Sequence, residues 1–296
     1  MSFIVPSGLP AIETLAAEGI KLNTEYGSDD RAVRILLLNL MPTKQATETQ
    51  LIRMLSSADI PCELYLMNTV TYVSKNTDSE YLERFYKGFD FYKDDYFDGL
   101  IITGAPVEQL DFKQVLYWDE LAEIFNWAKT HVSSVYSICW GAQAALYAYY
   151  GIPKYPLPQK MFGIFEHEIT DAENPLLKGI KSPFMSPQSR HAEVRKEDIL
   201  SIPELSLVAV SDIAGVHVVT NKDLSLICVT GHPEYDADTL AKEYFRDVEK
   251  GDEINCPSNY FPDDNPINPP VLSWREDGKT LYGNWVRLLA SKKDNK

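Results

Sequence analysis

Short apolar runs alternate with helix-like segments through the first half of the chain. Val33–Leu40 is a nearly continuous apolar run of strand length, as expected for a strand buried on both faces of a sheet. Three further strands are predicted at Cys62–Met67, Gly99–Thr103 and Ser133–Ile138. The segments that follow the four strands read as helices, at Thr43–Ser57, Asp78–Tyr86, Val115–Thr130 and Ala142–Tyr150.

This regular alternation predicts the fold class, an α/β protein with a mostly parallel sheet flanked by helices. In such sheets, ligands bind beyond the carboxyl ends of the strands. Asn39–Pro42, Gly104–Glu108 and Cys139 each follow a predicted strand. We therefore expect these three segments to converge in space.

The second half has a different pattern, with extra short strands separated by turns. These strands are expected at Phe162–Thr170, Leu207–Ser211, Gly215–Thr220 and Leu224–Thr230. Pro183–His191 contains two prolines and is predicted to be an ordered loop. Helices are expected at Asp236–Lys250 and Thr280–Ser291, with a proline-rich loop over 255–270 between them.

The pattern predicts two parts of unequal size. Residues 1–31 carry prolines and a polar end, and are expected to form an extended N-terminal arm with one helical turn. Such an arm would lie across the domain or a partner subunit. Residues 32–296 are expected to form a single α/β catalytic domain.

Composition excludes several classes of protein. The 296 residues carry a net charge of −15, which argues against nucleic-acid binding because no basic surface is implied. No apolar run approaches the ~20 residues of a membrane span, and no signal peptide is visible. The four cysteines show neither metal-site spacing nor a disulfide framework, so no metal site is expected and the cytoplasm is the expected location.

One cysteine stands at a chemically favourable place. Cys139 follows a predicted strand and precedes a predicted helix, within the segment Ser137–Gln143. Backbone N–H groups at a helix N-terminus suit an oxyanion and favour a thiolate. The alternative from the residues alone is a small buried structural cysteine.

A nucleophilic thiol needs a base and an acid that orients it. His232 follows a predicted strand, precedes Pro233 and lies two residues before Glu234, so a rigid turn could present both side chains. The alternative is a structural turn with Glu234 as its polar end. The other four histidines are less favoured: His131 ends a helix, His167 and His217 are expected to be exposed or half-buried strand residues, and His191 could line a pocket.

The Cys139 turn together with His232-Pro233-Glu234 resembles the class I glutamine amidotransferase fold. The pattern G-x-C-x-G-x-Q of that fold is present except that Ser137 replaces the first glycine. Segments along the chain also resemble the homoserine O-acyltransferase family, which shares this fold. They are VPSGLPA, LLNLMPTKQATETQ, ITGAPVEQLDFKQVLYW, SICWGAQAALYAYYGIPKY, KMFGIFEH, MSPQSRHAEV and GHPEYDADTLAKEYFRD.

The family resemblance implies transfer of an acyl group from acyl-CoA to Cys139 and then to the hydroxyl of L-homoserine. His232 would be the base, Glu234 would orient it, and the backbone N–H of Trp140 is the first candidate donor to the oxyanion. The resemblance places Lys160, Ser189 and Arg246 around homoserine. From the residues alone, Lys160 and Arg246 would read as solvated surface charges.

The resemblance also bears on the acyl donor. Family members that use succinyl-CoA have glycine at the position of Glu108, whereas acetyl users have glutamate there. A carboxylate would also repel the distal carboxylate of a succinyl group. We therefore expect homoserine O-acetyltransferase activity with acetyl-CoA as co-substrate, no cofactor and a homodimer. The alternatives are a homoserine O-succinyltransferase and a glutamine amidotransferase-type cysteine hydrolase.

Overall fold

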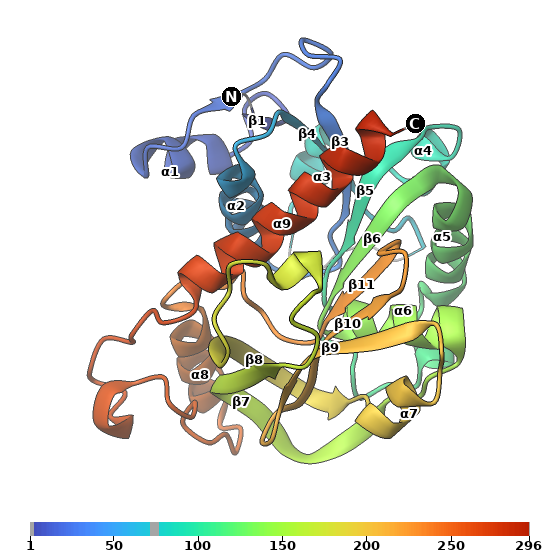
Figure 1. Ribbon diagram of the computed structural model, residues 1–296. Helices are drawn as coiled ribbons and strands as arrows, with labels where there is room; N and C mark the ends of the chain where they lie inside the picture. Colours follow the sequence, from blue (N-terminus) through green and yellow to red (C-terminus); the bar gives the residue numbers. More distant parts are fainter. Residues whose placement is uncertain (1–2, 72–76, 296) are drawn as a thin grey trace.

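The computed structural model describes residues 3–71 and 77–295, in which eleven strands form one sheet (Figure 1). Seven strands pair in parallel, in the order β2 (Leu22–Asn23), β1 (Phe3–Ile4), β4 (Cys62–Met67), β3 (Val33–Leu38), β5 (Phe97–Ile102), β6 (Val132–Ile138) and β11 (Leu226–Val229). The sheet continues antiparallel through β10 (Gly215–Asn221), β9 (Leu205–Ser211), β7 (Tyr155–Ile169) and β8 (Phe184–Glu193). The predicted fold class is therefore confirmed, including the extra strands of the second half.

Helices cover both faces of the parallel strands. One face packs against α1 (Ala11–Ala17), α2 (Lys44–Leu55), α3 (Ser79–Phe85) and α9 (Arg275–Asp294). The opposite face packs against α4 (Phe89–Tyr92), α5 (Trp118–His131), α6 (Trp140–Tyr150) and α7 (Lys196–Leu200). The sequence pattern did not predict α4 and α7, which are each too short to show a helical period. The remaining helix is α8 (Thr239–Lys250), beside a smaller core under the proline-rich loop.

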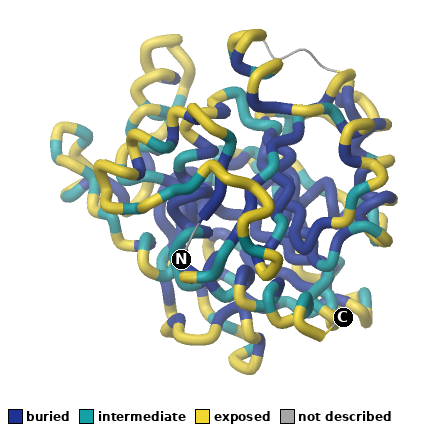
Figure 2. The backbone as a smooth tube through the Cα atoms, turned by 90° about the horizontal axis from the view of Figure 1, so that it is seen from above, coloured by how far each residue is buried: buried dark blue, intermediate teal, exposed yellow. Residues whose placement is uncertain are grey.

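Strand β3 shows why the central strands are so apolar. Ile35 and Leu37 enter the core on one face, whereas Leu36 and Leu38 enter the core on the other. Successive side chains of a strand point to opposite faces, so a strand covered on both sides needs apolar residues throughout. Figure 2 shows the buried backbone gathered in the middle of the molecule and the exposed backbone at its rim.

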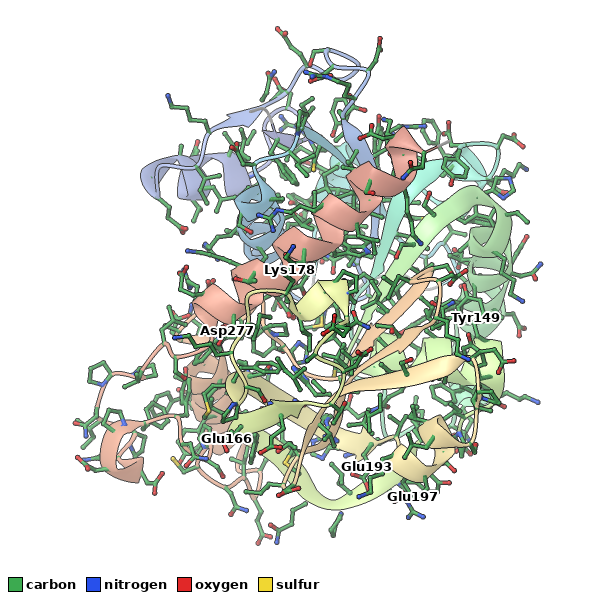
Figure 3. The ribbon with its side chains drawn as sticks, in the orientation of Figure 1. Tyr149, Glu166, Lys178, Glu193, Glu197 and Asp277 are labelled. Carbon is green, nitrogen blue, oxygen red and sulfur yellow. The ribbon has the colours of Figure 1, made fainter. Side chains whose placement is uncertain are left out.

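The C-terminal helix α9 crosses the parallel strands on the same face as α2 (Figure 1). Trp285 is fully buried there, and its ring nitrogen donates to Ser134 of β6 at 3.1 Å. Asn284 donates to the carbonyls of Leu176 and Lys178, which ties η3 (Pro175–Leu177) to the helix. Figure 3 labels Lys178, which follows η3, and Asp277, which lies in the first turn of α9. The predicted terminal helix is therefore present, and it begins five residues earlier than expected.

The described residues of the predicted arm are joined to the sheet. Phe3 and Ile4 form β1, which pairs with β4, and Leu22 and Asn23 form β2 beside it. Leu15 of α1 is fully buried in the main core. The segment therefore contains regular elements rather than only an extended path. Residues 1 and 2 lie outside the described residues, and the division into arm and domain stays a prediction.

The predicted loop Pro183–His191 is wrong, because the segment from Phe184 onward forms β8. This strand pairs with β7 only and stands at the edge of the sheet. An edge strand tolerates proline because one row of its N–H groups needs no partner. The proline content therefore marked an edge strand and not a loop.

The expected exposure of His167 and His217 is also wrong, since both side chains are fully buried. Their rings lie 4.0 Å apart between centroids. The side-chain amide of Gln188 donates to both rings, at 3.2 and 3.3 Å. In β7 His167 lies on the covered face while its neighbours Glu166 and Glu168 are exposed, whereas β10 is covered on both faces around His217. The alternation alone did not reveal which face of either strand is covered. In the described part of the chain, no helix is long and apolar enough to cross a membrane.

Gly163 in β7 gives a test of this packing. Its φ of +139° is unfavourable for other residues, and an added Cβ would overlap the backbone of Ser258. We expect Gly163→Ala to lower the free energy of unfolding by about 2–4 kcal/mol, measured by urea denaturation. Gly19→Ala is the control, because Gly19 also has a positive φ (+82°) but faces open space among the described residues. Its expected loss is about 1–2 kcal/mol, and equal losses in the two variants would contradict the overlap.

Candidate active site

Cys139 occupies a sharp turn between β6 and α6. Its φ and ψ are +50° and −116°, a conformation that L-residues rarely adopt. Such a conformation costs on the order of 1–3 kcal/mol and persists only where the surroundings enforce it. The N–H of Cys139 donates to the carbonyl of Val229 in β11 at 2.7 Å, which fixes the turn.

Two glycines allow neighbouring backbone to approach this turn. A Cβ on Gly141 would lie 2.6 Å from the carbonyl oxygen of Thr103, so α6 can begin here only with glycine. A Cβ on Gly104 would lie 3.2 Å from the Cβ of Cys139. Ser137, which replaces the first glycine of the family pattern, is fully buried in β6. The turn is therefore packed closely from the ends of β5, β6 and β11.

His232 is presented by the turn that follows β11. Its N–H donates to the carbonyl of Pro187 in β8 at 2.9 Å. A Cβ on Gly231 would lie 2.6 Å from the side-chain nitrogen of Gln188 and 2.7 Å from the Pro187 carbonyl. The glycine before His232 is therefore required by the close approach of β8, which places the imidazole beside the end of β6.

Cys139, His232 and Glu234 form a connected set. His232 is hydrogen-bonded to Cys139 on one side, and its Nδ1 lies 2.7 Å from Oε1 of Glu234 on the other. The hydroxyl of Tyr282 in α9 donates to Oε2 of Glu234 at 3.2 Å. The ring of Tyr235 stacks on the imidazole at 4.1 Å. Both oxygens of Glu234 are thus engaged, and the imidazole can turn little.

The electrostatics of this set favour a charged imidazole. Burial by itself would lower the pKa of His232, but the attraction of Cys139 and Glu234 outweighs it and raises this pKa to about 10. A protonated imidazole therefore lies beside the sulfur of Cys139 at neutral pH. The arrangement therefore places a proton donor next to the sulfur, where a leaving group would need one.

The three residue segments that were expected to converge all line one cavity of about 740 Å³. Met41 and Pro42 follow β3, Gly104–Glu108 follows β5, and Cys139 follows β6. His232 enters from the end of β11, and His191 also lines the cavity. The expectation drawn from parallel strand order is therefore confirmed. Among the described residues, no group of three His, Cys, Asp or Glu side chains is arranged to hold a metal ion.

The cations predicted to bind homoserine lie on one wall of this cavity. Lys160 of β7 is not the surface charge that the residues alone suggested, since its side chain is only 13% exposed. Its Nζ lies 4.1 Å from the centroid of the Phe162 ring and 2.6 Å from Oε1 of Glu243. Ser189 of β8 donates to the same oxygen at 2.9 Å. Arg246 of α8 is half-exposed and binds Asp247 at 2.6 Å.

Glu108 lies half-buried in the loop after β5 and lines the same cavity. The N–H of His191 donates to its Oε1 at 3.3 Å, and Lys154 donates to its backbone carbonyl at 2.6 Å. The carboxylate is therefore held at the cavity wall and is not a freely solvated loop charge.

Trp140 is the first residue of α6, so its N–H has no acceptor within the helix. This N–H could donate to the negatively charged oxygen that forms on a carbonyl when the sulfur of Cys139 attacks it. The site is thus suited to acyl transfer through a cysteine.

Several polar residues of this region were not predicted from the sequence. Glu243 stands three positions before Arg246 on α8, and that spacing alone would have placed both on one face of the helix. Tyr282 lies on the C-terminal helix α9, and no pattern in the sequence indicated that it would contact Glu234. Arg190 is fully buried, with its Nε donating to Gln188 at 3.1 Å and its Nη1 to the carbonyl of Ala192 at 3.0 Å.

Comparison with known proteins places this site in a family. A family model described as homoserine O-succinyltransferase matches residues 2–295. The chain belongs to this family of homoserine acyltransferases. A relative from Acetivibrio thermocellus, named homoserine O-acetyltransferase, is 50% identical over 97% of this chain and 95% of its own. Proteins of the same name from a Geobacillus species and from Ilyobacter polytropus (there numbered 1) are 48% and 46% identical, over 97% of this chain and 96% of theirs.

Solved structures confirm the fold that the resemblance implied. A glutamine amidotransferase from Thermotoga maritima superposes with a TM-score of 0.56 at 11% identity, covering 87% of this chain and 98% of its own. A putative GMP synthase subunit from Thermoplasma acidophilum gives a TM-score of 0.55 at 16% identity, covering 89% and 97%. At such identity the likeness concerns the fold alone.

The pKa of His232 provides a test of the ion pair. Replacing Glu234 by glutamine removes one of the two negative partners that raise this pKa. We expect Glu234→Gln to lower it by about 1–3 pH units, because an opposite charge at this distance stabilises the imidazolium by that much. NMR titration of ¹³C-labelled histidine, with His232→Asn to assign the signal, measures the shift. An unchanged midpoint would show that Glu234 does not stabilise the charged ring.

Proposed function

We propose that this protein is a homoserine O-acetyltransferase that carries the acetyl group on Cys139. The observation that carries the proposal is the hydrogen-bonded set Cys139–His232–Glu234 at the strand ends, beside a cavity wall that carries Lys160 and Arg246. Its family membership and its relatives named homoserine O-acetyltransferase supply the substrates. The product would be O-acetyl-L-homoserine, a precursor in methionine biosynthesis.

In the first step the thiolate of Cys139 attacks the thioester carbonyl of acetyl-CoA. The oxyanion that forms is stabilised by the N–H of Trp140, and the imidazolium of His232 gives its proton to the departing CoA sulfur. One thioester is replaced by another, so this step is nearly balanced in free energy and needs no cofactor.

In the second step His232, now neutral, takes the proton of the homoserine hydroxyl. The oxygen attacks the acetyl carbonyl, the carbon–sulfur bond breaks, and the thiolate of Cys139 is restored beside the imidazolium. Glu234 holds the ring orientation through both steps. Lys160, Ser189 and Arg246 would hold the amino-acid part of homoserine, with Arg246 offering a planar fork to its carboxylate.

The donor is assigned to acetyl-CoA because of Glu108. Its carboxylate is fixed at the cavity wall, where a second carboxylate on a succinyl group would meet a like charge. That repulsion in a partly desolvated site costs on the order of 1–3 kcal/mol. The homodimer and the cytoplasmic location expected from the sequence stay predictions.

The covalent step can be observed directly. Mixing the protein with acetyl-CoA should add one acetyl group to the intact mass, and Cys139→Ala should show none. Adding L-homoserine should then remove the group from the wild-type protein. Absence of the adduct on the wild-type chain would refute the covalent mechanism, and release of ammonia from glutamine would favour the hydrolase alternative.

The donor assignment rests on one carboxylate and can be tested by removing it. We expect Glu108→Gly to raise kcat/KM for succinyl-CoA relative to acetyl-CoA by about tenfold or more, because removal of the like charge restores on the order of 1–3 kcal/mol. Glu108→Gln is the matched variant, which removes the charge and keeps the volume. An unchanged donor preference in both variants would remove Glu108 from the argument.

A further inference from the structure

A cluster of fully buried polar side chains lies behind the turn that presents His232. It consists of His167 of β7, Gln188 and Arg190 of β8 and His217 of β10. Nε of Arg190 donates to Oε1 of Gln188 at 3.1 Å. Nε2 of Gln188 lies 3.2 Å from Nε2 of His167 and 3.3 Å from Nδ1 of His217. None of the four side chains takes part in the reaction proposed above, so their burial needs another explanation.

The hydrogen bonds fix the orientation of the Gln188 amide. A guanidinium only donates, so the amide oxygen must face Arg190 and the amide NH₂ must face the two rings. The two hydrogens of that NH₂ supply one bond to each ring. An imidazole nitrogen that accepts carries no proton, so the proton of His167 lies on Nδ1 and that of His217 lies on Nε2. Both rings are therefore neutral, and they are opposite tautomers.

The surroundings of the two rings also oppose a positive charge on either of them. Burial lowers the pKa of His167 to about 3, against an opposing contribution from the backbone of Phe165, and Arg190 adds to the lowering. Burial likewise holds the pKa of His217 well below its ordinary value, and His167, Arg190 and His232 act in the same direction. The neutral state that the hydrogen bonds require is thus also the state that burial and the neighbouring cations favour.

The cluster packs directly against Gly231, the residue before His232. A Cβ on Gly231 would lie 2.6 Å from Nε2 of Gln188 and 2.8 Å from Cε1 of His217. The backbone carbonyl of His217 also accepts from the N–H of Thr230 at 2.9 Å. In the described part of the chain, Nε2 of His217 has no hydrogen-bond partner, so Gln188 supplies the one hydrogen bond that this ring makes. The amide of Gln188 therefore holds the ring against which the turn packs.

The neighbours of Gln188 in β8 contact the proposed base and nucleophile. The carbonyl of Pro187 accepts from the N–H of His232 at 2.9 Å, and the carbonyl of Ser189 lies 3.9 Å from Sγ of Cys139. Strand β8 pairs with β7 only, and Pro187 has no N–H to donate to it. A slip of one residue would turn Gln188 to the other face of the strand, so its buried hydrogen bonds fix the register of this segment.

On the proposed function, in which His232 is the base, we propose that Gln188 is a positioning residue for that base. Its amide, oriented by Arg190, binds two neutral imidazoles and so ties β8 to β7 and β10 behind the turn. The carbonyl that β8 offers to the N–H of His232 then keeps the imidazole beside Cys139. Gln188 lies outside the lining of the cavity and acts on the reaction only through the backbone of the turn.

The wild-type protein tests the arrangement of the cluster without any variant. Long-range ¹H–¹⁵N NMR of histidine-labelled protein distinguishes a proton on Nδ1 from one on Nε2. We expect His167 to carry its proton on Nδ1 and His217 on Nε2, and both rings to stay neutral from about pH 8 down to about pH 5. Two rings of the same tautomer, or a ring that takes up a proton in this range, would overturn the arrangement.

Gln188→Met tests the effect on the base, because it keeps the length of the side chain and removes the amide. The freed strand should let the imidazole of His232 move away from Cys139, one of the two groups that raise its pKa to about 10. We expect NMR titration to show this pKa lowered by at least about one pH unit. We also expect kcat for acetyl transfer to fall by at least about tenfold, with KM for homoserine changed by less than about threefold.

Ser186→Ala is the matched control in the same strand. Ser186 is also fully buried, and its hydroxyl has no hydrogen-bond partner among the residues that the structure describes. We expect this variant to leave both kcat and the pKa of His232 close to their wild-type values. Gln188→Asn keeps the amide but shortens its reach, so it should show the same losses as Gln188→Met and serves where that variant does not fold.

Gln188→Glu tests the amide as a donor to the rings. The carboxylate still accepts from Arg190 but has no hydrogen to give. At least one ring should then turn a proton toward the new oxygen, which NMR detects as a proton on Nε2 of His167 or on Nδ1 of His217. Unchanged tautomers in both rings would contradict the donor role.

A merely structural role for Gln188 would have a different signature. A Gln188→Met variant that unfolds at lower urea concentration but keeps the wild-type kcat and pKa of His232 would overturn the inference. A wild-type protein that forms no acetyl-enzyme would instead refute the proposed function, while the tautomers and the pKa of His232 can still be measured. The two failures are therefore distinguishable.

Discussion

The turn at Cys139 is the constraint on which the rest of the site depends. A residue with φ of +50° at a strand–helix junction must be held by its neighbours, and here the holding groups come from β5 and β11. Val229 fixes the backbone of the turn, and Gly104 and Gly141 let the neighbouring segments come close enough to enclose it. Because Cys139 follows β6 directly, its sulfur lies at the carboxyl ends of the parallel strands. The N-terminus of α6 begins at the next residue. The position of the Cys139 sulfur therefore depends on the arrangement of the strands in the sheet.

The position of the histidine that is proposed as the base depends on the antiparallel half of the sheet. His232 is reached from β11, but its backbone is bound by Pro187 of β8, the edge strand. Ser189 of β8 and Lys160 of β7 form, together with Glu243, Arg246 and Asp247 of α8, the cavity wall that is proposed to bind homoserine, here named the acceptor wall. The extra strands thus hold the backbone of His232 in place. They also provide part of the proposed binding site for homoserine. The C-terminal helix completes the set, because Tyr282 holds the second oxygen of Glu234.

Charge is distributed unevenly around the reacting sulfur. On one side Glu234 and Cys139 keep the imidazole protonated, and on another Glu108 holds a carboxylate at the cavity wall, where the acyl donor is proposed to bind. The acceptor wall pairs each cation with a carboxylate, so that it is neutral before a ligand arrives. A chain with net charge −15 can in this way bind anionic groups locally, because the few cations that matter are oriented by partners within hydrogen-bond distance.

The sequence by itself determined which segments form the central parallel strands, since β3 and its neighbours must be apolar throughout to be covered on both faces. It also determined the positions of Cys139, His232 and Glu234, because sharp turns after strands leave local signatures in glycine and proline. Only the tertiary structure decided that Pro183–His191 is an edge strand, that His167 and His217 are buried, and that Tyr282 and Glu243 join the site. Those features depend on contacts between residues that are tens of positions or more apart in the sequence. The local pattern of apolar and polar residues does not indicate which distant segment will cover a given face of a strand.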